Sequence, residues 1–201
     1  MTGEVDDDRT RCGWAVGPLY REYHDFEWGR PLRGRNELFE RMSLEAFQSG
    51  LSWRIILRKR DNFRRAFDNF DVDTVSRYTE TDIARLMADT GIVRNRLKIE
   101  ATIANARAAA TLDVDLTDLL WSFAPPPGRP RPADPSQVPA TSSESIVMAK
   151  ELKRRGFRFV GPTTAYALMQ ATGMVDDHLQ CCWVPAAAPG ITGSWHTDAR
   201  R

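Results

Sequence analysis

The spacing of apolar residues is helical along almost the whole chain. Apolar side chains recur every three or four residues, as on one face of an α-helix, and the strict alternation of a β-strand is nearly absent. The pattern predicts an all-α bundle with helices at 36–50, 52–67, 81–90, 97–112, 116–123, 141–155 and 162–173. Gly50, Gly91 and Gly156 stand where helices are expected to end, and Pro162 suits a first helical turn.

An acidic residue lies on the apolar face of the first long helix. Leu38 and Glu45 share one face of segment 36–50 by their spacing. An unpaired buried carboxylate costs several kcal/mol in rough terms, so a glutamate here indicates a binding role. Trp53 follows just beyond the bend at Gly50, and an acid beside an indole suits a flat, polar, cationic ligand. In the structural alternative, Glu45 bonds a neighbouring helix end and Trp53 belongs to the core.

Four segments lack helical periodicity. Residues 1–10 are polar and acidic, which predicts a disordered leader, and 186–201 are expected to form a tail. Residues 12–34 are rich in aromatics and glycine and predict an ordered loop with one short helix. Residues 124–140 contain seven prolines and predict an extended connector without a helix. We therefore expect one fold over residues 11–185.

The segment 156–178 has the order of a helix-hairpin-helix element. A first helix is followed by a short glycine-containing hairpin, and a second helix is predicted to begin at Pro162. Backbone N–H groups at such a helix start point outward and bind a phosphate without a side-chain charge. DNA contacts are accordingly assigned to Gly161, Thr163 and Thr164. An ordinary helical hairpin is the alternative.

The composition is that of an ordinary globular protein. The chain has 201 residues, of which 42% are hydrophobic and 27% charged. Its formal net charge of +1 neither requires nor excludes a nucleic-acid partner. No apolar run approaches the roughly eighteen residues of a membrane span, and the acidic start MTGEVDDDRT is unlike a signal peptide. We expect a cytoplasmic protein without a membrane partner.

Cysteine and histidine residues gather near the two ends of the chain. His178 and Cys182 are four residues apart, which would place both on one face of a helical turn, and Cys12 and His24 lie in the aromatic N-terminal loop. A Cys₂His₂ set suits a tetrahedral zinc ion with no open position, which is a structural site. Cys181 competes as a ligand, and buried thiols and imidazoles without a metal are the alternative.

A series of short motifs resembles one known family. In chain order the motifs are Cys12-Gly13-Trp14, Pro18-Leu19-Tyr20, Tyr23-His24-Asp25, Glu27-Trp28-Gly29, Leu44-Glu45, Gln48, Gly50-Leu51-Ser52-Trp53, Gly91-Ile92, Lys98-Ile99, Trp121-Ser122-Phe123, Gly156-Phe157-Arg158-Phe159-Val160-Gly161 and Asp177-His178. Over residues 11–185 the chain resembles the DNA-3-methyladenine glycosylase I family. The resemblance implies an all-helical fold of the helix-hairpin-helix glycosylase superfamily with a structural Zn²⁺. It implies Cys12, His24, His178 and Cys182 as the zinc ligands, in preference to Cys181.

The resemblance also implies a substrate and a pocket. The implied reaction is hydrolysis of the N-glycosidic bond of N3-methyladenine in alkylated double-stranded DNA, after the base is flipped out of the helix. Glu45 would be the catalytic residue, accepting an N–H bond from the cationic base. The implied base-binding aromatics are Trp53, Tyr23, Trp14, Tyr20 and Trp28. Gly50 and Leu51 correspond to the plug that the family inserts into the DNA.

Two departures from related enzymes bear on the mechanism. Bifunctional relatives place a Schiff-base lysine where this chain has Pro162 or Thr163, so no lyase activity is expected. Those relatives use an aspartate near the position of Asp176; here Asp176 or Asp177 is expected to cap a turn or orient a metal ligand. The bulky Phe47 would alter the depth of the pocket.

The expected protein is a monomeric, monofunctional glycosylase. A non-catalytic, zinc-stapled helix-hairpin-helix DNA-binding module is the main alternative, and a zinc-bearing protein-interaction scaffold is a third. The inward Glu45 favours the enzyme, because a DNA-binding module has no reason to bury a carboxylate.

Overall fold

The computed structural model describes residues 8–186, and these residues form helices and loops only. In chain order the elements are α1 (Pro18–Phe26), α2 (Arg35–Gln48), α3 (Trp53–Ala66), η1 (Asp68–Phe70), α4 (Val72–Ser76), α5 (Glu80–Ala88), α6 (Arg96–Ala110), α7 (Leu116–Trp121), η2 (Pro135–Gln137), α8 (Ser143–Arg154) and α9 (Pro162–Ala171). The all-α prediction is confirmed for this part of the chain. Across the same residues, no helix is both long and apolar enough to cross a membrane.

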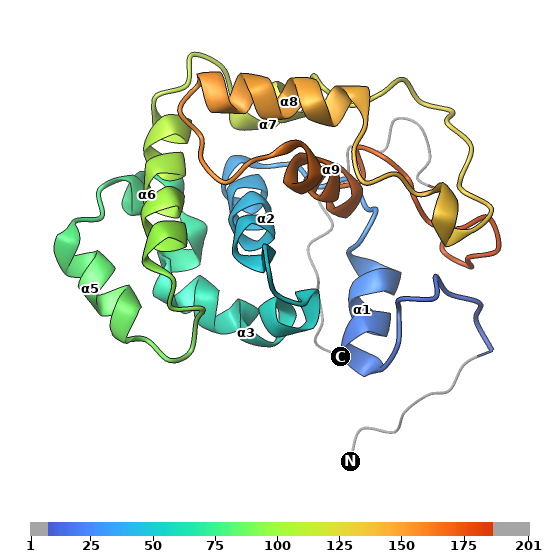
Figure 1. Ribbon diagram of the computed structural model, residues 1–201, viewed down its shortest axis with the longest axis horizontal. Helices are drawn as coiled ribbons and strands as arrows, with labels where there is room; N and C mark the ends of the chain where they lie inside the picture. Colours follow the sequence, from blue (N-terminus) through green and yellow to red (C-terminus); the bar gives the residue numbers. More distant parts are fainter. Residues whose placement is uncertain (1–7, 187–201) are drawn as a thin grey trace.

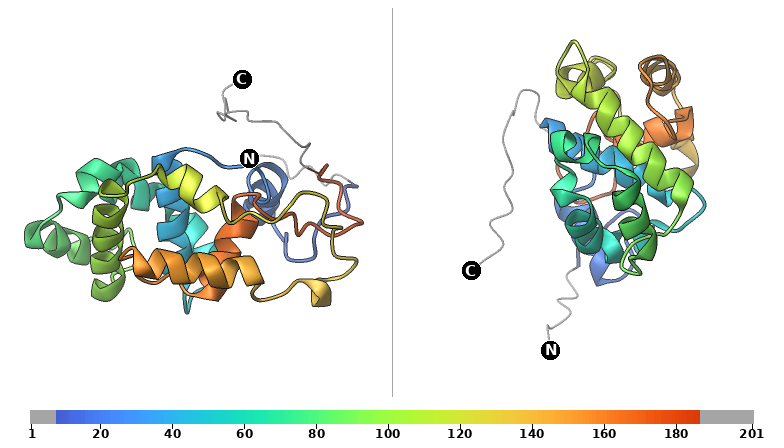
Figure 2. Two further views of the ribbon diagram at one scale, coloured as in Figure 1. Left: turned by 90° about the horizontal axis from the view of Figure 1, so that it is seen from above. Right: turned by 90° about the vertical axis from the view of Figure 1, so that its left-hand side faces the viewer.

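Helix α2 lies at the centre of the fold (Figure 1) and contacts α3, α6, α7 and α9. Its Leu38, Phe39 and Met42 are completely buried, because apolar positions recur around most of its circumference. Helix α4 packs on α6, and α8 packs on α9. Figures 1 and 2 place α5 at one end of the molecule and α1 with the proline-rich connector at the other.

A second, smaller apolar cluster joins the two ends of the described chain. It consists of Cys12, Leu179, Cys182 and Val184, with Trp28 and Trp183 packed against it. The backbone N–H of Trp183 donates to the carbonyl of Thr10 at 2.9 Å, and the Arg9 guanidinium lies 4.1 Å from the Trp183 ring centroid. The packed chain therefore includes residues 9 and 10 of the predicted leader. Residues 1–7 and 187–201 lie outside the described residues.

The longer helices begin and end within two residues of the predicted positions. Gly161 is the N-cap of α9 and Pro162 its first residue, as the sequence indicated. Helix α8 begins at Ser143 rather than at 141, because the Ser142 hydroxyl accepts the N–H of Ser145 and forms the cap. The short helix α4 was missed by the sequence analysis. Its start is stabilised by Asp71, which accepts the N–H of Thr74 at 2.8 Å.

The proline-rich segment 124–140 is not the wholly extended connector that the sequence predicted. Pro135–Gln137 form a 3₁₀ turn, whose start is capped by Asp134 accepting the N–H of Ser136 at 2.8 Å. The segment is also tied to the C-terminal loop: Arg131 Nη1 donates to the carbonyl of Val184 at 2.7 Å. Proline has few backbone conformations even in the unfolded chain, so ordering this segment costs little conformational entropy.

Candidate active site and metal centre

The bend between α2 and α3 is stabilised by a buried lysine of helix α6. Helix α2 ends at Gln48, and Gly50 adopts φ +80°, a left-handed conformation that strains other residues. Lys98 on α6 donates to the carbonyls of Phe47 and Ser49 at 2.8 and 2.6 Å, which satisfies the last turn of α2. Leu51 follows at the tip of the bend and is exposed.

A cavity of about 470 Å³ opens beside this bend. All six residues predicted to form the pocket line it, namely Glu45, Trp53, Tyr23, Trp14, Tyr20 and Trp28. The rings touch one another: Tyr23 and Trp53 have centroids 5.5 Å apart, and Trp14 and Trp28 are 5.0 Å apart. The indole N–H of Trp53 is buried without a hydrogen-bond partner. The cavity is therefore an aromatic box with the acidic Glu45 among its walls.

The Glu45 carboxyl is buried and unpaired. The residue is 5% exposed, and within residues 8–186 no side chain or backbone group hydrogen-bonds or ion-pairs with its carboxylate. Burial raises the pKa of Glu45 to about 7, an effect that the positive charge of Arg41 partly offsets. The structural alternative, in which Glu45 bonds a helix end, is therefore wrong. The acid is available to a ligand.

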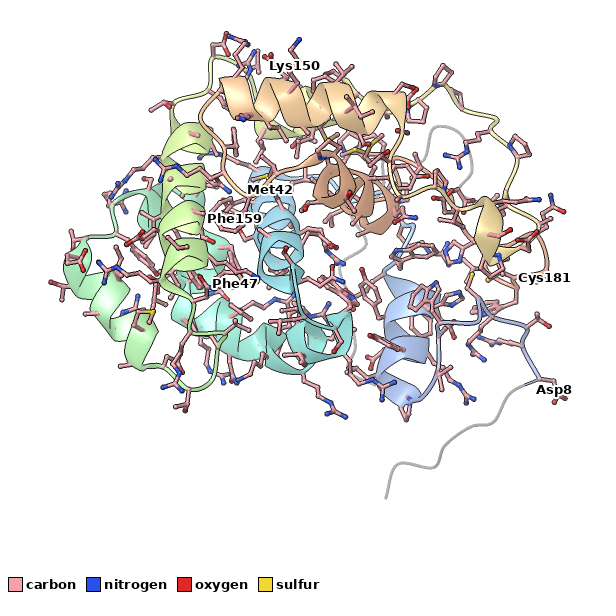
Figure 3. All side chains as sticks on the ribbon, viewed as in Figure 1. Asp8, Met42, Phe47, Lys150, Phe159 and Cys181 are labelled. Carbon is pink, nitrogen blue, oxygen red and sulfur yellow. The ribbon has the colours of Figure 1, made fainter. Side chains whose placement is uncertain are left out.

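Phe47 does not shape the cavity, contrary to the sequence-based expectation. Its side chain is completely buried and packs on Phe63, with ring centroids 4.7 Å apart. Figure 3 shows Phe47 and Met42 on the central helix, among the side chains of the main core. Residues two apart on a helix point in different directions, so Phe47 and Glu45 face different surroundings.

Much of the remaining cavity wall comes from the second half of the chain and was not predicted. These further lining residues are Gln48, Pro135, Val138, Ala167, Gln170, Asp177 and Leu179, together with Cys12 and Gly13. The Asp177 carboxylate is buried and accepts hydrogen bonds from Tyr166 at 2.6 Å and Gln170 at 2.9 Å. Arg129 from the connector lies 3.1 Å from its other oxygen, an ion pair without hydrogen-bond geometry. Among the lining residues from the second half of the chain, only Asp177 belonged to a motif noted in the sequence, Asp177-His178.

Asp176 is not among the residues that line the cavity. Its carboxylate accepts the backbone N–H of His178 at 3.2 Å and pairs with Arg131 at 2.8 Å. Asp176 thus caps the turn that carries His178, as expected for one member of the acidic pair.

Four buried side chains converge next to the cavity. Cys12, His24, His178 and Cys182 place one ligand atom each within 4.8 Å of one another. The separations include 3.4 Å for Cys182 Sγ to His24 Nε2, 3.6 Å for Cys182 Sγ to His178 Nδ1, and 3.7 Å for Cys12 Sγ to His178 Nδ1. These three separations lie in the range of roughly 3.3–3.8 Å found between the ligands of a tetrahedral zinc ion, and the four residue types suit such a site.

The two C-terminal members of this cluster, His178 and Cys182, converge in a way that the sequence did not predict. His178 and Cys182 lie in a non-helical loop, where the N–H of Cys182 donates to the carbonyl of Leu179 at 2.9 Å. This turn buries Cys182 and leaves Cys181 exposed. Figure 3 shows Cys181 at the right-hand end of the molecule. The geometry therefore groups Cys182, and not Cys181, with the other three.

In His24 and His178, the ring nitrogen that faces away from the cluster is hydrogen-bonded to another residue. His24 Nδ1 donates to Asp25 at 2.7 Å, and His178 Nε2 donates to the carbonyl of Trp28 at 3.1 Å. These bonds direct His24 Nε2 and His178 Nδ1 to the centre of the cluster. Close packing requires Gly29, since a Cβ there would lie 2.9 Å from His178 Nε2. Burial raises the pKa of the Cys12 thiol to about 12 and lowers the pKa of His178 to about 4, which favours the neutral thiol and the neutral imidazole.

The hairpin between α8 and α9 leaves the first residues of α9 exposed to solvent. Asn105 on α6 fixes it: its side chain donates to the carbonyl of Arg158 and accepts the N–H of Arg158, at 3.0 and 2.7 Å. Gly161, Pro162 and Thr163 are exposed, and Thr164 is half-buried. The arrangement is that of two packed helices joined by a short turn, and no lysine occupies the start of α9.

Comparison with known protein families shows to which family this chain belongs. The methyladenine glycosylase family model matches residues 14–185, which is most of the chain. The chain belongs to the methyladenine glycosylase family. The resemblance drawn from the sequence motifs is thereby confirmed.

Individual family members cover nearly the same length. DNA-3-methyladenine glycosylase 1 of Escherichia coli K12 is 44% identical over 185 residues, which covers 89% of this chain and 99% of the relative. A crystal structure of 3-methyladenine DNA glycosylase I matches with a TM-score of 0.84 at 42% identity, covering 87% of this chain and 98% of the other. The Staphylococcus aureus enzyme, whose structure describes 3-methyladenine recognition, matches with a TM-score of 0.83 at 32% identity, covering 90% and 100%. The helical arrangement around the cavity is therefore the fold of this glycosylase family.

Proposed function

We propose that this methyladenine glycosylase releases N3-methyladenine from alkylated double-stranded DNA by hydrolysing its N-glycosidic bond, as a monofunctional enzyme of base excision repair. The observation that carries the proposal is the unpaired, buried Glu45 carboxylate facing a cavity lined with aromatic rings. We place the activity in the cytoplasm and assign it to a monomer.

The chemistry follows from the charge of the substrate. N3-methyladenine in DNA carries a positive charge, so its bond to C1′ is already weak. The bond breaks with its electron pair moving to the base, which leaves as a neutral molecule. The sugar cation takes the hydroxide part of a water molecule, and the remaining proton goes to solvent. A strong general acid is unnecessary, and the protein's task is to extract and select the base.

The cavity favours a cationic base over neutral adenine. Glu45 is assigned as the catalytic residue: its carboxylate accepts an N–H bond from the base edge and attracts the charge in a dry environment. Tyr23 and Trp53 supply flat faces that attract the cation through their ring electrons. Trp14, Tyr20 and Trp28 complete the aromatic wall, and neutral adenine gains no comparable electrostatic stabilisation.

We assign DNA binding to two exposed segments, the α2–α3 bend and the α8–α9 hairpin. Gly50 and Leu51, at the tip of the α2–α3 bend, enter the space left by the flipped nucleotide. The α8–α9 hairpin is assigned as a helix-hairpin-helix element, in which the N–H groups of Gly161, Thr163 and Thr164 bind a backbone phosphate. With no lysine at the start of α9, no Schiff base forms and no strand cleavage is expected.

A structural zinc ion is proposed at the Cys/His cluster. Cys12, His24, His178 and Cys182 would hold it, since their four ligand atoms lie within 4.8 Å of one another and two thiols with two imidazoles suit a tetrahedral zinc ion. Four protein ligands leave no open position for substrate. The ion would clamp the N-terminal loop to the C-terminal loop, both of which line the cavity.

The decisive experiment is chromatography of the bases released from methylated duplex DNA by the purified protein. Release of free 3-methyladenine without strand cleavage is the expected result. Binding of the same DNA with no base release would instead identify a non-catalytic DNA-binding module. A protein that neither releases base nor binds a duplex with an abasic site would be an interaction scaffold.

Leu51→Ala should slow excision from duplex DNA about tenfold, because the unstacked duplex loses the side chain that fills its gap. Binding of free 3-methyladenine, which involves no duplex, should be unchanged. Val114→Ala is the matched control, since it also trims an exposed apolar side chain. Single-turnover excision rates and free-base titrations measure both effects. Equal rates for the Leu51 variant and the control would contradict the plug assignment.

A further inference from the structure

Arg41 is a buried arginine in contact with the aromatic residue Tyr23, and it has no role in the reaction proposed above. Arg41 stands one helical turn before Glu45 on α2 and is 8% exposed. It does not line the cavity. Residues four apart on a helix are neighbours, so Arg41 would ordinarily be expected to pair with Glu45. No such ion pair forms among the described residues.

Two groups on α1 and the loop after it hold Arg41 away from Glu45. Arg41 Nη1 donates to the phenol oxygen of Tyr23 at 2.7 Å, and Nη2 donates to Glu27 at 3.3 Å. Glu27 is itself fixed by Arg60 on α3, whose Nη2 donates to it at 2.9 Å. The guanidinium also lies 5.3 Å from the Tyr23 ring centroid.

This arrangement determines what the Tyr23 hydroxyl can do. A guanidinium has donors only, so the phenol oxygen must act as acceptor toward Arg41. The hydroxyl hydrogen is then directed elsewhere, and within residues 8–186 no protein group accepts it. Tyr23 lines the cavity beside Glu45. A bond donated by a charged group also polarises the O–H, which makes it a stronger donor.

We propose that Arg41 is a positioning residue that fixes the Tyr23 hydroxyl as a hydrogen-bond donor into the base-binding cavity. The inference rests on the proposed function, because the acceptor is a ring nitrogen of the bound base. When the glycosidic bond breaks, the electron pair moves to the base, and its ring nitrogens become better acceptors than in the cation. The bond from Tyr23 therefore strengthens as the reaction proceeds, and such a bond raises kcat more than it lowers KM.

The test is a double-mutant cycle between Arg41→Met and Tyr23→Phe, measured on excision of 3-methyladenine from methylated duplex DNA. Rates are compared on the alkaline plateau of each variant's pH profile, because loss of the Arg41 charge also raises the pKa of Glu45. In the wild-type background Arg41→Met should lower kcat about tenfold or more, the typical effect of a hydrogen bond to a charged group, with KM nearly unchanged. In the Tyr23→Phe background, where no hydroxyl remains to be positioned, it should lower kcat less than about twofold. Arg41→Lys, which retains a charged donor, should recover part of the loss.

Controls separate this role from a general effect on folding. Arg64→Met removes another interhelical arginine, one that pairs with Glu40 and does not line the cavity, and should leave kcat unchanged. Melting temperature and metal content of each variant verify folding. Should Arg41→Met not fold, Arg41→Gln and Arg41→Lys complete the same cycle. Equal losses in both backgrounds, or no loss in either, would overturn the proposal.

The same cycle can be run on binding of free 3-methyladenine, followed by fluorescence of the tryptophans in the wall. The free base is neutral and accepts the Tyr23 bond, so Arg41→Met should weaken its affinity about tenfold, again only where Tyr23 keeps its hydroxyl. If the wild-type protein released no base, the proposed function would fail. Coupling in this binding cycle would still support the positioning role of Arg41, and its absence would overturn it.

Discussion

Glu45→Gln should reduce the rate of 3-methyladenine release about a hundredfold or more, the usual range for losing a preorganised electrostatic group in a dry site. Glutamine keeps the shape of the side chain but cannot offer a negative charge to the cationic base. Metal content and the circular dichroism spectrum should remain those of the wild type. Single-turnover excision is the measurement, and wild-type kinetics in the variant would remove Glu45 from the mechanism.

The pH profile should report the same group. Burial places the pKa of Glu45 at about 7 in the free protein, so the carboxyl becomes protonated as the pH falls through this value. The substrate charge comes from methylation and does not titrate in this range. We therefore expect kcat/KM of the wild type to fall below about pH 7, while the residual activity of Glu45→Gln shows no such limb. A wild-type profile that is flat between pH 5 and 8 would contradict the assignment.

The Glu45→Gln protein should also be more stable than the wild type at alkaline pH. The pKa of Glu45 rises from 4.5 in the unfolded chain to about 7 in the folded one, so the folded state binds the proton more tightly. Stability therefore declines as the pH rises from about 4.5 to about 7, by on the order of 3 kcal/mol for this group alone. Glutamine carries no such penalty. Thermal melts at pH 8 measure the gain, and a lower melting temperature in the variant would contradict it.

Cys182→Ser should lower the free energy of unfolding by more than about 4 kcal/mol, as the loss of a structural metal ion does. For a domain of this size, such a change shifts the melting temperature by roughly 10 °C. The bound zinc should fall from one equivalent to near zero. Because the N-terminal and C-terminal loops both line the cavity, affinity for free 3-methyladenine should fall as well.

Cys181→Ser is the matched control for that change. It removes the same atom one residue away, on an exposed side chain outside the cluster. Zinc content, measured by atomic absorption, and the thermal melt should both match the wild type. A chelator that removes the metal from the wild type should reproduce the Cys182→Ser melt. Equal destabilisation by the two serine variants would contradict the ligand assignment.

The sequence was most informative about features that are encoded by neighbouring residues within one helix. The 3.6-residue period of segment 36–50 was enough to place Glu45 on an inward face, and Gly50 marked the bend that brings Trp53 beside it. Local start and stop signals likewise gave Pro162 as the beginning of α9. These features depend on residues close together in the chain, so they can be predicted without tertiary contacts.

The parts that sequence reasoning missed depend on contacts between distant segments. Asp177 reaches the cavity because the C-terminal loop packs against the N-terminal one, and Gln170 lines it from α9, a helix distant in sequence from α1 and α2. The connector showed no apolar period, although Pro135 and Val138 become part of the cavity wall. Spacing alone left Cys181 and Cys182 both open, and Cys182 was chosen from the family resemblance and not from the turn that the structure shows.

The joining of the two ends has a consequence for how the protein is made. The walls around the cavity include Cys12 and Trp14 from the beginning of the chain and Asp177 and Leu179 from near the end of the described part. A ribosome makes the first of these segments long before the second, since synthesis proceeds at about 5–20 residues per second. The central helices can pack while translation continues, but the nascent polypeptide has no complete receptacle for a damaged base. Activity begins only when the last loop has emerged and closed over the first.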